Sequence, residues 1–176
     1  MMKRLRTLQV LAFWLLCLAG GVASAESRDV QKFFFDQQLG DFKAELVNAK
    51  HDGKRGILLM FEQEDCPWCA RMKSTILNQS EVQDYYKKNF LIFAVDIKGD
   101  TTLVDFQGNE TTEKKFSEKM RVRATPVFAF IDVDGNLAYR FTGASKDMNE
   151  FLMLGHYVAD GAYKTQAFVA YKQTAK

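Results

Sequence analysis

The sequence predicts an α/β fold in three layers, in which helices flank a central mixed β-sheet. The apolar run 56–61 is unbroken, as is typical of a strand buried on both faces of a sheet, and 90–97, apolar apart from Asp96, is expected as the next buried strand. The helical pattern between them is long enough for a crossover that makes these strands parallel. Two later strand-like runs, 127–132 and 137–141, flank Asp134-Gly135-Asn136, a sequence typical of an antiparallel hairpin. A parallel pair joined to a hairpin gives a mixed sheet.

Helices are expected where a capping residue precedes an apolar helical period. Asp41 stands before a helix whose apolar face is Phe42, Leu46 and Ala49, and Gly53 ends that pattern. A short edge strand is expected over 101–106, turning at 107–109. The other expected helices are 67–78, one opening at 80–86 with Ser80 as its cap, one through Met120 capped by Thr111 or Thr112, 146–158, and a short one within 162–172.

Residues 1–25 have the pattern of a secretory signal peptide. Three basic residues precede an apolar core at 10–18, and Ala23-Ser24-Ala25 is a small-residue cleavage site. An uncleaved membrane anchor is the alternative, but the apolar stretch is short for a spanning helix. We therefore expect a cleaved leader, a mature domain over 26–176 and no stable membrane insertion of that domain.

The charge of the chain is nearly balanced once the leader is set aside. The whole sequence has 24 basic and 22 acidic residues, and three of the basic ones lie in the leader. The mature chain therefore carries 21 basic against 22 acidic side chains. A nearly neutral domain offers no basic surface for nucleic acid, so we expect no nucleic-acid partner.

The sequence is organised around Cys66-Pro67-Trp68-Cys69, which stands between a buried strand and a helix. Residues three apart share one face of a helix, so the two sulfurs can form a disulfide or open as a pair. Cys66 occupies the expected N-cap position and Pro67 the first helical position, where a missing N–H costs nothing. The N–H groups and dipole of the helix favour a thiolate at Cys66. The pattern predicts a dithiol–disulfide exchange centre.

A structural zinc site and an inert structural disulfide are two other uses of a cysteine pair. A structural zinc site needs four ligands, and outside the pair the sequence offers only Cys17, in the leader, and two histidines. Neither His51 nor His156 has ligand spacing, so we expect no metal. An inert structural disulfide is the second alternative, but a bridge across two residues constrains the unfolded chain little.

Several of these features together resemble the thioredoxin family. They are the Cys-Pro-Trp-Cys segment between strand and helix, Thr125-Pro126 before a late strand, and Asp134-Gly135 followed by a closing helix. The stretches 95–100, 112–114 and 155–163 resemble exported thioredoxin-like proteins of the SoxW type, which are associated with bacterial sulfur-oxidation operons. The similarity extends over roughly residues 42–163. It implies a thioredoxin-like fold.

The resemblance also implies roles for individual residues. Cys66 would be the nucleophile that attacks a partner disulfide, and Cys69 the resolving thiol. Pro126 would be a cis-proline facing the cysteine pair, and the backbone of Thr125 would pair with an extended partner chain. Pro67 would support the first turn of the helix, while Trp68 is expected as a partly exposed platform beside the sulfurs. No cofactor is implied.

This sequence departs from the pattern of cytoplasmic thioredoxins at one position, Met60. Cytoplasmic thioredoxins carry a buried aspartate six residues before the first cysteine, and methionine cannot transfer a proton. Glu62, Glu64 or Asp65 could substitute through water, but the last two are expected to be exposed, so the sequence assigns no general base.

The same segment bears on the direction of electron flow. Trp68 adds no positive charge, and three carboxylates lie just upstream of Cys66, which favours a reductant or exchange protein over a dedicated oxidase. The expected partners are exported proteins with thiols or disulfides, in the periplasm, with a membrane thiol carrier as electron source. A disulfide oxidase or isomerase, and a binding module with an idle disulfide, are the alternatives.

Overall fold

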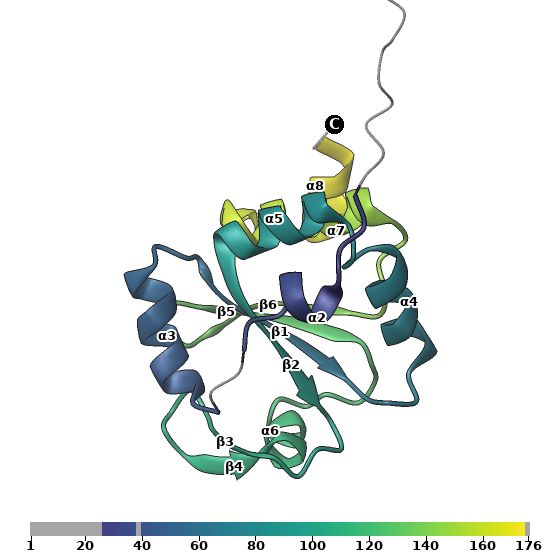
Figure 1. Cartoon of the computed structure of the whole chain (residues 1–176). Helices are drawn as coiled ribbons and strands as arrows, with labels where there is room; N and C mark the ends of the chain where they lie inside the picture. The colour runs from purple at the N-terminus through teal and green to yellow at the C-terminus, as the bar shows by residue number, and fades with distance from the viewer. Residues whose placement is uncertain (1–25, 38–39, 175–176) are drawn as a thin grey trace, which may run out of the picture.

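The computed structural model describes residues 26–37 and 40–174 (Figure 1). The expected signal peptide, with Cys17, lies outside the described residues. Among the helices of the described part, none combines the length and apolar character needed to cross a membrane.

The central sheet has four strands in the order β2-β1-β5-β6 (Figure 1). β1 (Gly56–Glu62) runs parallel to β2 (Phe90–Asp96), whereas β5 (Val127–Asp132) pairs antiparallel with both β1 and β6 (Leu137–Thr142). The unbroken apolar run at 56–61 therefore lies in an interior strand, as its sequence predicts. The mixed sheet flanked by helices confirms the predicted thioredoxin-like α/β fold.

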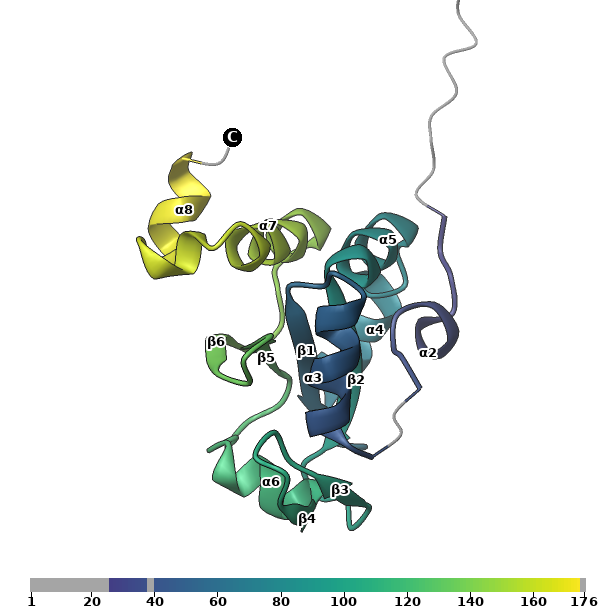
Figure 2. The same ribbon diagram turned by 90° about the vertical axis from the view of Figure 1, so that its left-hand side faces the viewer.

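Alternate residues of β1 enter two separate cores, one on each face of the sheet. Leu58 and Met60 face a core built with α4 (Pro67–Thr75), α5 (Ser80–Asn89), α7 (Met148–Ala159) and α8 (Phe168–Thr174). Residues 57, 59 and 61 face a second core, built with α3 (Phe42–His51) and α6 (Glu113–Lys119). Figure 2 shows α3 on one side of β1 and β2, with α4 and α5 behind them. The sheet is thus the middle of three layers.

The segment before α3 covers part of the first core. Asp29 caps the short helix α2 (Val30–Phe33), and Phe34 and Phe35 after it are buried. Asp36 then lies along the free edge of β2, where its N–H donates to the carbonyl of Ile92 and its carboxylate accepts from the Ile92 N–H. This segment therefore occupies hydrogen-bonding groups at one edge of the sheet.

Two helix boundaries differ from the sequence-based expectations. α5 has Gln79, not Ser80, as its N-cap, because the N–H of Ser80 donates to the carbonyl of Glu26. α4 ends at Thr75 rather than near residue 78, and the next two residues, Ile76 and Leu77, turn into the core and are buried. In both places a tertiary contact sets the boundary.

The segment expected as an edge strand forms a separate hairpin. β3 (Thr102–Val104) pairs antiparallel with β4 (Glu110–Thr112) in a two-stranded sheet of its own, and Thr112 caps α6. Figure 2 shows this hairpin beside α6 at one end of the molecule. The expected strand and the turn at 107–109 are thus confirmed, but the strand is not at the edge of the central sheet, because the turn returns the chain onto β3.

The last elements are the helices α7 and α8 and, between them, the one-turn helix η2 (Ala162–Lys164). Asp147 caps α7, and Gly161 has the positive φ angle of 75° that lets the chain leave the end of α7. Phe168 of α8 packs on Tyr139 and Phe141 of β6, so the C-terminal helix covers the exposed edge of the first core.

Candidate redox site

The cysteine pair forms the first turn of α4. Cys66 is the N-cap, its Sγ accepts a hydrogen bond of 3.1 Å from the N–H of Cys69, and Pro67 is the first helical residue. The two cysteines form a disulfide with their Cα atoms 5.2 Å apart. Cys66 is 6% exposed and Cys69 3%. A strand that ends before a proline-started helix is thus what places both sulfurs at the positive end of the helix dipole.

Trp68, between the cysteines, points outward and is 59% exposed. The guanidinium of Arg71 lies 5.9 Å from the centre of its ring. Arg71 also donates hydrogen bonds of 2.9 and 2.8 Å to the carbonyls of Ser145 and Lys146, in the loop between β6 and α7. One arginine therefore joins the aromatic surface beside the sulfurs to a loop far away in sequence.

The Thr125–Pro126 peptide bond is cis and precedes β5. Val127, the next residue, pairs with Phe61 of β1. Pro126 therefore lies at the end of β1 that leads into Cys66. Pro126 is buried, its carbonyl accepts from the N–H of Gly143, and Thr125 is half-buried. The sheet register thus brings two segments that the sequence singles out, Cys66–Cys69 and Thr125–Pro126, to the same end of the sheet.

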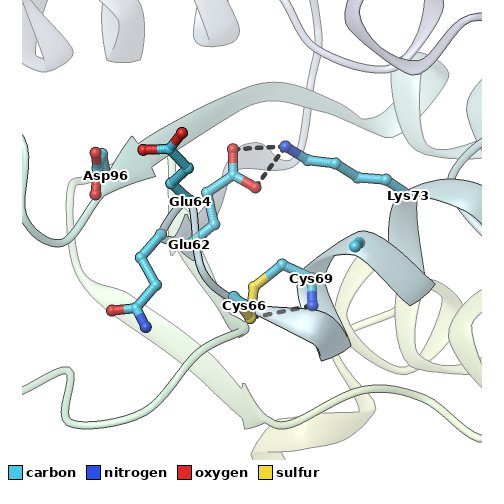
Figure 3. A pocket seen from close by; sticks show the side chains of 8 residues that line it. Glu62, Glu64, Cys66, Cys69, Lys73 and Asp96 are labelled. Carbon is cyan, nitrogen blue, oxygen red and sulfur yellow. Dashed lines mark hydrogen bonds and ion pairs between the residues drawn. A yellow bond between two sulfur atoms is a disulfide. The ribbon is translucent and has the colours of Figure 1, made fainter.

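A pocket of about 330 Å³ adjoins the disulfide (Figure 3). Within it, the ammonium of Lys73 contacts both carboxylate oxygens of Glu62, at 2.8 and 2.6 Å. The pocket is lined by Glu62, Gln63, Glu64, Cys66, Cys69, Ala70, Lys73 and Asp96. The cysteines therefore face a polar, water-accessible space that holds one lysine and three carboxylates.

Sheet geometry explains why these carboxylates stand beside the cysteines. Met60 and Glu62 are two residues apart on β1 and so lie on the same face, the face that α4 covers. Met60 is completely buried, while Glu62 is at the end of the strand and pairs in register with Asp96 of β2. Glu64, like Asp65, is exposed, as the sequence predicts.

A fourth carboxylate approaches the same region from α6. Glu113 accepts a hydrogen bond of 3.2 Å from the N–H of Asp96, and a side chain at Gly99 would come within 2.2 Å of its carboxylate. Burial raises the pKa of Glu113; the charges of Asp96 and Glu62 act in the same direction, and hydrogen bonds from Asp96 and Thr101 oppose them. The carboxylates of three elements therefore interact with one another here.

Sequence reasoning found the cysteines and weighed Glu62, but it missed Lys73 and Asp96. Lys73 follows Cys69 by four residues, which places it on the same face of α4, and this spacing was a usable signal. Asp96 required the register of β1 against β2. In the part of the chain that the structure describes, no group of three His, Cys, Asp or Glu side chains is arranged to hold a metal ion.

The chain matches the family model described as a thioredoxin-like domain over residues 42–159. A comparison with curated proteins gave no significant match. Among solved structures, it is similar to a putative disulphide-isomerase from Bacteroides thetaiotaomicron, with a TM-score of 0.58 and 22% identity over 82% of this chain and 100% of that one.

Two further structures have the same fold at comparable similarity. A thioredoxin-fold protein from Helicobacter pylori has a TM-score of 0.55 and 21% identity, over 75% of this chain and 99% of that one. A thioredoxin from Thermus thermophilus has a TM-score of 0.54 and 23% identity, over 72% and 90%. Since the family model spans most of the described domain, the chain belongs to the thioredoxin-like family.

Proposed function

We propose that the mature protein is an exported thiol–disulfide oxidoreductase that mainly reduces disulfides of exported partner proteins. The observation that carries this proposal is the disulfide at the N-terminus of α4, opening onto a carboxylate-lined pocket. Both the disulfide and the pocket are formed by residues of this chain.

In the proposed reaction, the reduced protein begins with Cys66 as a thiolate. The thiolate attacks one sulfur of the partner disulfide, and the other partner sulfur leaves as a thiolate. Cys69 then attacks the sulfur of Cys66, which forms the Cys66–Cys69 disulfide and releases the second partner thiolate. Two electrons pass to the partner, and its two thiolates take up protons. The helix N-terminus stabilises the Cys66 thiolate before the first step.

The surface around the cysteines supports a role in binding an extended partner segment. Trp68 is exposed next to the disulfide, and the Thr125–Pro126 segment lies at the same end of the sheet. Proline has no N–H, so Pro126 leaves the backbone groups of Thr125 as the ones available to a partner. We assign Trp68, Thr125 and Pro126 to partner binding and Pro67 to the support of the helix start.

The charges around the pair support reduction as the main direction. A strong oxidant needs a highly stabilised Cys66 thiolate. Here Trp68 carries no charge, Glu64 and Asp65 are exposed just before Cys66, and the charge of Lys73 is paired with Glu62. The guanidinium of Arg71 is hydrogen-bonded to the carbonyls of Ser145 and Lys146, so the carboxylates of Glu64 and Asp65 oppose a thiolate and therefore oppose a strongly oxidising pair.

The place of action follows from the signal-like segment 1–25. We propose that this segment directs export to the periplasm and is cleaved, and that a membrane thiol carrier supplies the electrons. A reductant in an oxidising compartment needs such a supply, because its own disulfide form accumulates otherwise.

The partner-trapping experiment tests the proposal. Cys69→Ser should accumulate mixed disulfides through Cys66, because the residue that releases the partner is missing. Cells expressing this variant would be quenched with acid, and the covalent complexes separated without reductant and identified. Cys66→Ser is the matched control and should trap none. Equal complexes with both variants, or none with Cys69→Ser, would contradict the proposal.

The reduction potential tests the direction of transfer. We expect a value between those of glutaredoxins and thioredoxin, about −200 to −270 mV, measured by equilibration with glutathione or a dithiol of known potential. A value near the −120 mV or so of a strongly oxidising periplasmic protein would reverse the direction and favour the oxidase alternative.

A further inference from the structure

The release step of the proposed reaction requires that the Cys69 thiol lose its proton. An unassisted cysteine thiol is mostly protonated at neutral pH, and only its thiolate attacks a disulfide. Cys69 is nearly buried, and Met60, its neighbour in the same core, has no acid–base chemistry. A proton acceptor must therefore reach Cys69 from elsewhere.

We propose that Glu62 accepts the proton of Cys69 through the pocket that the two side chains share, and that Lys73 positions its carboxylate. Both residues lie next to Cys69 for geometric reasons. Lys73 is one helical turn after Cys69 on α4, and Glu62 is one pleat repeat beyond Met60 on the β1 face that α4 covers. Figure 3 shows the ion pair and the disulfide around the same hollow.

Contacts on both sides hold the ion pair in place. The ammonium of Lys73 contacts both oxygens of Glu62 and lies 5.8 Å from the centre of the buried Phe35 ring. Among the residues that the structure describes, Lys73 is the one that donates a hydrogen bond to the Glu62 carboxylate. A carboxylate oxygen has more than one acceptor site, so Glu62 keeps capacity to accept a proton directly or through one water molecule.

The other charged groups around Glu62 come from three parts of the chain. They are Asp96 of β2, Glu113 of α6 and Glu64 of the loop after β1, in addition to Lys73 of α4. Lys73 is the cation among these groups and keeps the Glu62 carboxylate oriented. In the proposed step, Glu62 takes the proton while the partner is released and gives it to the departing partner thiolate or to water.

The step balances without any additional reagent. The proton moves from Cys69 to Glu62, and the Cys69 thiolate forms a bond to the sulfur of Cys66. The bond between Cys66 and the partner breaks, and the partner thiolate leaves with the electron pair. Reprotonation of that thiolate returns Glu62 to its carboxylate form.

The test separates this inference from the proposed function on which it rests. The reduced protein would be mixed with 5,5′-dithiobis(2-nitrobenzoate) in a stopped-flow instrument between pH 5 and 9. Attack by Cys66 releases one chromophoric thiolate in a phase that depends on reagent concentration. Attack by Cys69 releases the second in a concentration-independent phase. Cys69→Ser identifies the phases, because it should retain only the first.

Glu62→Gln should slow the second phase by about ten- to a hundredfold near neutral pH, and the first phase much less. The difference should shrink towards pH 9, where hydroxide removes the Cys69 proton without help. Glu118→Gln is the control for loss of a negative charge, because Glu118 of α6 is exposed and does not line the pocket. It should leave both phases unchanged.

Absence of the first phase in the unmodified protein would contradict the proposed function. An intact first phase with an unchanged second phase and pH profile in Glu62→Gln would overturn the inference alone. The inference also fails if Asp96→Asn, and not Glu62→Gln, slows the second phase.

Discussion

Two lysine–carboxylate pairs in this molecule have nearly the same distance between nitrogen and oxygen, but their surroundings differ. Lys73 contacts Glu62 at 2.6 Å beside the disulfide, and Lys119 contacts Asp105 at 2.5 Å in the loop between β3 and β4. Asp105 is 1% exposed, and its carboxylate also accepts from the N–H groups of Gln107 and Asn109 and from the Asn109 side chain. The acceptor sites of Asp105 are therefore occupied by donors from its own loop.

Glu62 differs because Lys73 is its only donor among the described residues and the rest of its carboxylate borders a pocket. A carboxylate that is surrounded by donors stabilises the fold, whereas one with free acceptor sites next to a thiol can take part in chemistry. Both carboxylates have a lysine partner. What separates the structural carboxylate from the one placed to react is therefore the set of other groups around each of them.

The largest expected effect is a loss of stability when Asp105, the structural carboxylate of the two, is replaced. Asp105→Ala removes a buried acceptor that the loop N–H groups and Lys119 share, so we expect a loss of about 3 kcal/mol in the free energy of unfolding. Urea denaturation of the oxidised protein measures it. Both phases of the thiol reaction should keep their rates in the folded variant, because Asp105 is not part of the redox pocket.

The chain contains its own control for this variant. Asp132 begins a second Asp-x-x-Gly-Asn loop, and its carboxylate likewise accepts from the N–H groups of Asp134 and Asn136. It is less buried than Asp105, and Asp105 alone of the two has a lysine at hydrogen-bond distance among the described residues. Asp132→Ala should therefore cost about 1 kcal/mol. Equal losses at both sites would show that burial and Lys119 add nothing.

These two loops also show what the sequence could and could not predict. Asp134-Gly135-Asn136 between two apolar runs is sufficient to predict the β5–β6 hairpin, because the turn signal and the strand pattern agree. The equivalent loop at 105–109 has only three paired residues on each side, so the pattern was too short to show that β4 existed.

The redox site also has some features that the sequence predicts and others that it does not. Cys66 as N-cap, Pro67 as the first helical residue and the exposure of Trp68 follow from local sequence, and the structure has all three. The neighbourhood of Glu62 does not, because it depends on which face of β1 lies under α4 and on the register between Glu62 and Asp96. Long-range geometry of this kind leaves no local pattern in the chain.

The second prediction concerns acid stability. Burial opposes the charge of Asp105, but the hydrogen bonds from Lys119, Asn109 and Gln107 outweigh it and lower its pKa from 3.8 to about 2. A lowered pKa in the folded state adds stability above the unfolded pKa, and this stability is lost as the pH falls from about 4 to about 2. The loss should be about 2 kcal/mol.

Unfolding measured at a series of pH values checks this expectation. Asp105→Asn, which does not titrate, should lack this part of the acid dependence and have a smaller slope below about pH 4. An unchanged slope in Asp105→Asn would mean that other carboxylates account for the acid dependence, and that the hydrogen bonds to Asp105 do not favour its charged form.

The smallest expected effect is on the stability provided by the pair in the redox pocket. We expect a coupling energy below about 1 kcal/mol between Glu62→Gln and Lys73→Gln in a double-mutant cycle on the oxidised protein, because both side chains are partly exposed to water. The matched cycle, Asp105→Asn with Lys119→Gln, should give about 1.5 kcal/mol, because the Asp105 carboxylate is buried. A larger coupling at Glu62 than at Asp105 would reverse the comparison. It would mean that the pair beside the cysteines serves mainly to hold α4 on the sheet, and that Glu62→Gln slows thiol exchange by displacing the helix.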